Sequence, residues 1–299
     1  MELIWLQDFV ALAECGNFSR AAEIRHVTQP AFSRRIRSLE EWIGVPLFIR
    51  SAQGCSLTDA GERFGQDAEK LVRQLLLLRQ EAREAGGMEL RTLRFAATQT
   101  LSFTFFPGWM RIFGGNAEFG EVQLNTGSMV VCEQMLLQGQ AQFLLCHRHP
   151  AVETSLSADK FQCLVVGHDK LVAVTGVDED GEARWRVDGG GDPVSYLGYS
   201  PDSGLGRILA SQAQMQNLQA MRGPVLTSHL AAVLLPMVLS GAGLAWLPLS
   251  LVAAEMQAGH LLRALAPEKD IPLEICVCRS TEASSPAAEA FWRLLQEHR

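Results

Sequence analysis

The sequence predicts an α/β protein in which a small winged helix-turn-helix unit and a long linker helix precede a two-lobed α/β unit. Short helical patterns separated by turn signals run to about residue 57, and one uninterrupted helical pattern covers residues 58–85. From Thr92 onward, apolar β-like runs alternate with amphipathic helices, which is typical of an α/β domain with a mainly parallel sheet. We therefore expect a first domain at 1–57, a linker helix and hinge at 58–87, and a second domain at 88–299.

Composition narrows the class of protein. The chain has 299 residues, 47% hydrophobic and 20% charged, which is typical of a globular protein with more than one core. Its net charge is −7, so a nucleic-acid-binding surface would have to be a local basic patch. The N-terminus lacks the basic and apolar regions of a signal peptide, and no run of about 18 apolar residues suggests a membrane span. We expect a cytoplasmic protein with no membrane partner.

Seven cysteines are scattered without any CxxC spacing. Together with the missing export signal, this predicts reduced thiols that act mostly as small core residues. Cys276 and Cys278 alternate within one apolar run, so we expect both on one strand face, where core packing explains them better than metal or redox chemistry. His147 and His149 lack the further ligands that would complete a metal site, and we expect no metal and no cofactor.

The most informative segment begins at Thr28, which is placed to cap a helix, with Pro30 in the first turn where a missing N–H costs little. Four apolar residues of this helix fall at helical spacing and should face inward. They are Phe32, Ile36, Leu39 and Ile43.

The opposite face of this helix carries groups that a DNA major groove can bind. Gln29 can pair with adenine, Arg34 or Arg37 with guanine, and Ser33 with a base or phosphate. Four arginines and no acid occur between residues 25 and 37, which predicts a local basic surface. A merely solvated charged face is the alternative.

Two flanking segments support this interpretation. A short helix at 19–24 contains Ala21 and Ala22, which allow close helix crossing. Residues 46–50 and 55–57 can pair as a hairpin, a wing from which Arg50 can reach a phosphate. The expected DNA contacts are Ser19, Arg20, Thr28, Gln29, Pro30, Ser33, Arg34, Arg37 and Arg50.

The helix at 58–85 begins at Thr58, a capping residue, and its apolar pattern predicts a coiled-coil seam. Apolar residues recur at alternating steps of three and four, at Phe64, Ala68, Leu71, Leu75, Leu78 and Ala82. We expect a homodimer through residues 58–85, with a core helix of a single domain as the alternative. Gly86–Gly87 should end the helix and form a hinge.

The second domain should have two lobes with a cleft between them, because its strand at 273–278 returns to the first part of the sheet. We place lobe I at about 88–162 and 266–299, and lobe II at about 163–265. Ligands bind beyond the C-terminal ends of strands, where helix N-termini offer free N–H groups to an anion or carboxylate. The expected effector contacts are Gln99, Thr100, Ser102, Gly127, Ser128, Cys146, His147, Tyr199, Ser200, Thr227 and Ser228. Ordinary helix capping is the alternative explanation of each hydroxyl.

Several motifs together resemble those of LysR-type transcriptional regulators. They are Phe18–Ala22, Thr28–Glu40, Gly44–Phe48 and Leu57–Gly61, with a later match at Leu239–Pro248. The resemblance implies a winged helix, a linker-helix dimer, a periplasmic-binding-protein-like effector domain and usually a homotetramer. It also implies that Gln29, Ser33 and Arg34 occupy positions that enter the major groove. Tyr199–Ser200 and Ala245–Pro248 are similar to the hypochlorite-responsive subgroup.

We therefore expect a sequence-specific DNA-binding regulator of transcription, controlled by a small molecule or an oxidant, that binds double-stranded DNA as a homodimer or homotetramer. The alternative is a solute-binding or enzymatic α/β protein with an accessory N-terminal domain. No GxSxG, HExxH or Walker-type motif occurs, so we do not expect an enzyme.

Overall fold

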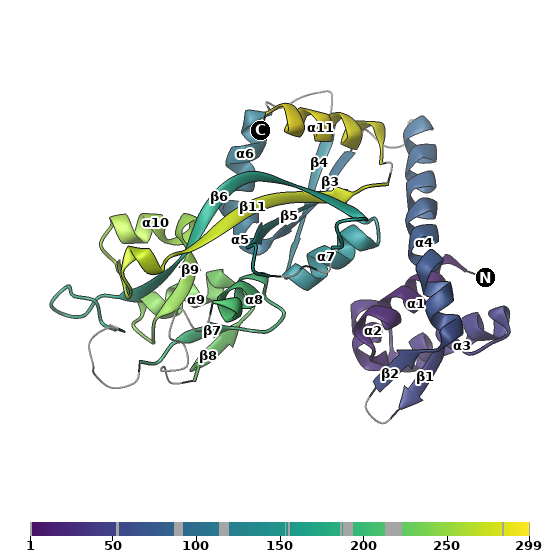
Figure 1. Cartoon of the computed structure of the whole chain (residues 1–299), viewed down its shortest axis with the longest axis horizontal. Helices are drawn as coiled ribbons and strands as arrows, with labels where there is room; N and C mark the ends of the chain where they lie inside the picture. The colour runs from purple at the N-terminus through teal and green to yellow at the C-terminus, as the bar shows by residue number, and fades with distance from the viewer. Residues whose placement is uncertain are drawn as a thin grey trace. The chain divides into compact units, whose positions relative to one another are not determined.

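The protein is described by a computed structural model that covers residues 2–51, 54–86, 92–113, 120–152, 154, 156–185, 187, 194–212, 223–282 and 284–298. The chain divides near residue 89 into two compact units (Figure 1). None of the described helices is both long and apolar enough to cross a membrane.

The N-terminal unit consists of three helices, a two-stranded hairpin and the start of a long helix. These elements are α1 (Leu3–Cys15), α2 (Phe18–Ile24), α3 (Gln29–Ile43), β1 (Phe48–Ser51), β2 (Gly54–Leu57) and α4 (Asp59–Ala85). β1 and β2 pair antiparallel, which confirms the predicted hairpin. The predicted inward face of α3 is confirmed as well, since Phe32, Ile36 and Leu39 are fully buried beside Phe9 of α1.

Helix starts in this unit depend on different caps. The Asn17 side chain accepts hydrogen bonds from the backbone N–H groups of Ser19 and Arg20 at the start of α2. At the start of α4, Thr58 Oγ1 accepts a hydrogen bond of 3.0 Å from the Gly61 N–H, as predicted. Thr28 occupies the N-cap of α3, but its side chain makes no capping bond, so that prediction was wrong in its detail.

Helix α4 divides into a buried beginning and an exposed continuation. Ala68 is 3% exposed and Phe64 packs against the core of the same unit, so this end of the predicted seam serves the monomer. Leu71, Leu75 and Leu78 are all exposed. The predicted hinge at Gly86–Gly87 lies partly outside the described residues.

The C-terminal unit is built on a seven-stranded sheet in the order β10-β6-β11-β5-β3-β4, with β9 also paired to β6. Its strands are β3 (Thr92–Thr98), β4 (Glu121–Gly127), β5 (Phe143–Arg148), β6 (Phe161–Gly176), β9 (Ala245–Pro248), β10 (Leu261–Arg263) and β11 (Ile271–Ser280). Among the described strands of this sheet, β3 pairs parallel with β4 and β5, and the other pairings are antiparallel.

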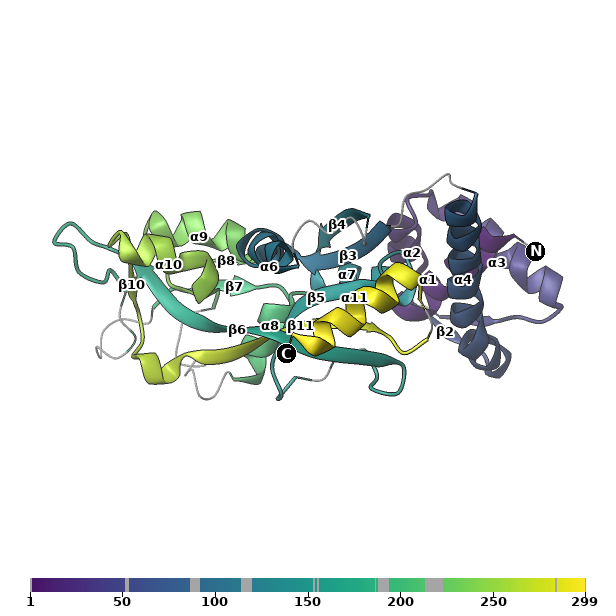
Figure 2. The same ribbon diagram turned by 90° about the horizontal axis from the view of Figure 1, so that it is seen from above.

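The prediction of a mainly parallel sheet was therefore wrong. Alternation of strands and helices fixes parallel pairing only where a helical crossover joins two neighbouring strands. The long strands β6 and β11 instead lie side by side over ten residue pairs, as Figures 1 and 2 show. They pass through both lobes of this unit, which share one sheet.

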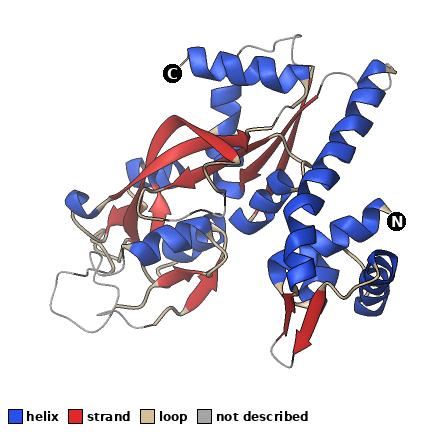
Figure 3. Cartoon of the chain, turned by 45° about the vertical axis from the view of Figure 1, so that its right-hand side comes forward, coloured by secondary structure: helices blue, strands red, loops and turns tan. Residues whose placement is uncertain are grey.

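Each lobe has its own core. The core at the β3, β5 and β11 side is aromatic, with Phe95, Phe143 and Phe291 in ring contact. The other is centred on the fully buried Trp246 of β9. Helices cover the sheet on both sides (Figure 3). They are α5 (Gln99–Thr104), α6 (Phe106–Ile112), α7 (Met129–Leu137), α8 (Gly204–Ser211), α9 (Ala231–Leu239), α10 (Leu249–Gln257) and α11 (Pro286–Glu297), with a short pair of strands, β7 (Leu197–Tyr199) and β8 (Leu226–Ser228).

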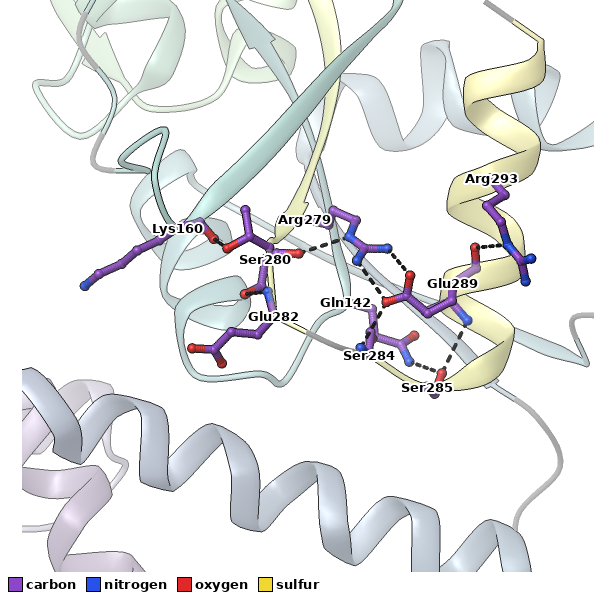
Figure 4. Close-up of polar contacts among 11 residues, drawn as sticks. Gln142, Lys160, Arg279, Ser280, Glu282, Ser284, Ser285, Glu289 and Arg293 are labelled. Atoms are coloured by element: carbon purple, nitrogen blue, oxygen red, sulfur yellow. Dashed lines mark hydrogen bonds and ion pairs between the residues drawn. The ribbon is translucent and has the colours of Figure 1, made fainter.

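Polar contacts attach the C-terminal helix to the sheet (Figure 4). Arg279 of β11 binds the Glu289 carboxylate with two hydrogen bonds of 2.9 and 2.8 Å. Ser285 caps α11 and accepts a further hydrogen bond from the Gln142 side chain. Burial by itself raises the pKa of Glu289, but the bonds from Arg279 outweigh it and lower the pKa below its usual value.

The prediction that all cysteines are reduced was wrong for one pair. Cys163 of β6 and Cys278 of β11 face each other in the antiparallel register and form a disulfide, with Cα atoms 4.0 Å apart. The pair is 115 residues apart in the chain, so spacing along the sequence gave no sign of it. The other five cysteines are free. Burial raises the pKa of Cys276 to about 11 and that of Cys132 to about 12, so these two thiols are unreactive core residues, as expected.

Candidate nucleic-acid interface and ligand cavity

The outward face of α3 carries an ordered set of polar groups. Gln29, Arg34 and Arg37 are exposed and Ser33 is half-buried. The Gln29 side-chain amide donates a hydrogen bond of 3.1 Å to Ser33 Oγ, one turn further along the helix. The Arg34 and Arg37 guanidinium groups form no ion pair with any described residue. This face therefore presents an amide, a hydroxyl and two unpaired cations to solvent.

Neighbouring predicted residues are also accessible. Ser19 and Arg20 lie exposed in the first turn of α2, and Thr28 and Pro30 are exposed where α3 begins. Arg50, on the hairpin, is exposed but lies 4.4 Å above the Phe18 ring, a cation–π contact that limits its reach.

Two arginines of the predicted basic surface belong to the interior instead. Arg25 Nε donates to the fully buried Asp8 carboxylate at 2.8 Å, and Arg35 Nη1 contacts the same carboxylate at 3.4 Å. Arg25 also donates to the Gln7 side chain. The four-arginine patch therefore reduces to Arg34 and Arg37, because the acid that neutralises the other two lies in α1, outside the segment from which the patch was predicted.

In the C-terminal unit, a cavity of about 30 Å³ lies where several helices begin. It is lined by the first residues of α7, α8 and α9, by the start of α5, and by His147 of β5. Helix N-termini carry unpaired N–H groups and a partial positive charge. Their convergence, with no acidic side chain among the described lining residues, makes this an anion-favouring site.

The cavity brings together five predicted effector residues and leaves out six. Those that line it are Gln99, Thr100, Gly127, Ser128 and His147. Ser102, Cys146, Tyr199, Ser200, Thr227 and Ser228 do not line it.

Four of the excluded side chains have contacts elsewhere. Ser102 donates to the Gln99 carbonyl, Tyr199 donates to the Trp246 carbonyl at 2.8 Å, and Ser228 accepts from the Leu230 N–H. Cys146 is fully buried in the sheet. Ser200 Oγ is buried with no partner among the described residues, and Thr227 is exposed. A position after a strand end therefore did not by itself decide which side chains line the cavity.

Sequence reasoning missed several lining residues, among them Thr98, Ser203 and His229. Ser203 caps α8 by accepting from the Gly206 N–H, and a Ser followed by an apolar helical run was a usable signal. Thr98 Oγ1 is buried and has no hydrogen-bond partner among the described residues. This hydroxyl therefore has unused hydrogen-bonding capacity in a residue that lines the cavity.

His147 belongs to a polar cluster with Asp169 and Ser250, in which the first two side chains are buried and Ser250 is exposed. Its Nε2 lies 3.4 Å from Asp169 Oδ2, and Ser250 donates to the same carboxylate at 2.5 Å. Burial alone raises the pKa of Asp169, but the hydrogen bonds from His147 and Ser250 outweigh it and lower the pKa below its usual value. Asp169 stands between the other two, whereas a nucleophilic triad requires the histidine in that position. The cluster orients His147 and is not arranged to activate Ser250.

Comparison with known proteins covers the whole chain. Residues 3–62 match the bacterial regulatory helix-turn-helix protein of the lysR family, and residues 86–299 match the LysR substrate binding domain. The HTH-type transcriptional regulator YjiE of Escherichia coli is 30% identical over 99% of this chain and 95% of its own length.

Two solved structures are similar over the full length. The hypochlorite-specific LysR-type regulator HypT of Salmonella typhimurium is 29% identical, with a TM-score of 0.60, covering 100% of this chain and 98% of its own. DarR of Vibrio fischeri, solved in complex with DNA, is 28% identical with a TM-score of 0.57, covering 99% and 98%.

Proposed function

This chain belongs to the LysR family of bacterial transcriptional regulators, and we propose that the outward face of α3 reads its operator while a small anion in the C-terminal cavity controls it. The observation that carries the proposal is that Gln29, Ser33 and Arg34 lie on one exposed face, backed by a fully buried apolar face. Such a helix can enter a major groove without unfolding its own unit.

We assign different tasks to the predicted DNA contacts. Gln29 and Arg34 can each bind a base edge with two hydrogen bonds, and this gives sequence preference. Arg37, Arg50, Arg20 and the hydroxyl of Ser19 suit phosphate contacts, which position the protein without reading sequence. Thr28 and Pro30 set the start of α3. Because this role requires access to the chromosome, we propose that the protein works in the cytoplasm.

The test is binding to the duplex upstream of its own gene, measured by fluorescence anisotropy between 50 and 300 mM salt. The expected result is affinity that falls steeply with salt, and a scrambled duplex bound at least about a thousandfold more weakly at equal salt. Equal affinity for both duplexes would contradict a sequence-reading role.

We propose a sensing role, without catalysis, for the cavity. Its ligand is an anion, because α7, α8 and α9 all direct their N-termini at it and the Thr98 hydroxyl there lacks a partner among the described residues. The experiment is a thermal-shift series with acetate, succinate and sulfate on the wild type and on Ser128→Asp.

The aspartate adds a negative charge at the start of α7, where it suits the helix but repels an anion. Stabilisation by the anion should disappear in Ser128→Asp and persist in the control Ser157→Asp, whose side chain is exposed elsewhere. Equal responses of the two variants would place the anion elsewhere.

We further propose that α4 forms the homodimer contact over residues 58–85, as a step toward a homotetramer. Leu71, Leu75 and Leu78 are 41%, 37% and 59% exposed, and they recur at the spacing of a coiled-coil seam. Sedimentation should show that Leu75→Glu weakens self-association, whereas Gln74→Glu, one residue away on an exposed position, leaves it unchanged.

A further inference from the structure

The carboxylate of Glu133 on α7 is buried and accepts fewer hydrogen bonds than a carboxylate can. The residue is 4% exposed, and its Oε1 has no partner among the described residues. Its Oε2 receives one long contact of 3.5 Å from Arg207 Nη2. An ionised carboxylate accepts up to about four hydrogen bonds and is costly to bury without them. Glu133 is therefore ready to accept from a further donor.

This carboxylate lines a second cavity next to the anion-favouring one. The second cavity is also about 30 Å³, and Met129, His147 and Gly204 line both. The two cavities are therefore neighbours with lining residues in common. Arg148 and Arg207 also line the second cavity.

An anion-favouring feature and an under-bonded carboxylate lie a short distance apart: the helix N-termini at the first cavity, and Glu133 at the second. Glu133 follows Met129 by four residues, or about 6 Å along α7 at a rise of 1.5 Å per residue. Side chains on a helix lean toward its N-terminus, so the Glu133 carboxylate is inclined toward the helix start that favours an anion. A ligand carrying both charges a few ångströms apart would satisfy both features.

We propose that the effector is a zwitterion of the amino-acid type, with a carboxylate at the helix N-termini and an ammonium group that donates to Glu133 Oε1. This inference rests on the anion site proposed above and adds the second pole of the ligand. A simple amine does not fit equally well, because without its own negative charge it would face the guanidinium groups of Arg148 and Arg207 uncompensated.

The test compares amino acids with the same acids lacking the amino group, by thermal shift and calorimetry on the full chain. The pairs are alanine and propionate, aspartate and succinate, and glutamate and glutarate. At least one amino acid should bind about tenfold or more tightly than its partner, since the ammonium adds a charged hydrogen bond. If the des-amino acids bind as tightly as their amino acids, the role of the ammonium group is refuted, but the proposed anion site is not. If no member of any pair binds, both fail.

Glu133→Gln supplies the matching change in the protein, because it keeps the shape and removes the charge. The preference for the amino acid should disappear while affinity for the des-amino acid stays within about twofold. Glu121→Gln, on an exposed position of β4, should keep the preference. Should Glu133→Gln fail to fold, N-acetylation of the preferred amino acid makes the same test on the wild type: the acetylated compound must bind at least about tenfold more weakly, and equal binding refutes the role of the ammonium.

Discussion

Replacing Asp8 with alanine removes the buried carboxylate that holds Arg25 and Arg35. The carboxylate is fully buried, Arg25 is 15% exposed and bonded at 2.8 Å, and Arg35 is 30% exposed at 3.4 Å. A hydrogen bond to a charged group contributes about 2 kcal/mol when largely buried, and the longer, more exposed contact contributes about 1 kcal/mol or less. We expect Asp8→Ala to cost about 3 kcal/mol, the lower end for breaking a buried ion pair.

Hydrogen exchange read by mass spectrometry can assign this loss to one part of the full chain. A loss of about 3 kcal/mol should speed exchange of peptides from α1, α2 and α3 about a hundredfold, with peptides from β3 and β5 unchanged. Asp67→Ala is the control, because Asp67 is 65% exposed and its pairs with Arg63 and Lys70 contribute about 0.5 kcal/mol at most. If both variants exchange alike, the buried network does not hold this unit together.

Three further predictions concern both units. Thiol titration of the unfolded, unreduced protein should find five free thiols and find seven after reduction, because Cys163 and Cys278 are bonded; seven before reduction would contradict the disulfide. Asp169 has a lowered pKa in the folded protein, so its contribution to stability is complete above its unfolded pKa near 4 and is lost as the pH falls through the folded value. Thermal unfolding between pH 2.5 and 6 should therefore show a weaker acid dependence in Asp169→Asn, and an unchanged profile would count against the hydrogen bonds assigned to it. Gly61→Ala should lower the melting temperature, at a cost of about 1–3 kcal/mol, since its Cβ would lie 2.1 Å from the Leu47 carbonyl oxygen; a wild-type melting temperature would refute this close approach.

The N-terminal unit was predictable because its signals are local. The apolar spacing from Phe32 to Ile43, the capping position of Thr58 and the hairpin around Gly54 all depend on neighbours within a few residues. The predicted four-arginine basic surface was wrong in this unit, because Arg25 and Arg35 are paired with Asp8, which lies on another helix, α1. A count of charges along a segment cannot reveal a partner outside it.

The C-terminal unit was predicted less completely because its features depend on strand neighbours. Alternation assigned Cys278 to a strand face but could not say that β6, more than a hundred residues earlier, lies beside it. The rule that ligands bind beyond strand ends selected Gln99, Ser128 and His147, which line the cavity, and it equally selected Tyr199, whose hydroxyl donates to the Trp246 carbonyl. The unpartnered oxygen of Glu133 could be recognised only in the structure, because the sequence does not show which buried oxygens lack a hydrogen-bond donor.

We propose above that the outward face of α3 reads the base sequence. The most direct measurement is the ratio of affinities for the duplex upstream of its own gene and for a scrambled duplex, at one salt concentration. Arg34→Ala should reduce that ratio by about 5- to 150-fold, corresponding to about 1–3 kcal/mol for one base-reading arginine. Arg111→Ala, which removes an exposed arginine from α6, should leave it unchanged. A ratio in Arg34→Ala equal to that of the wild type would contradict the claim.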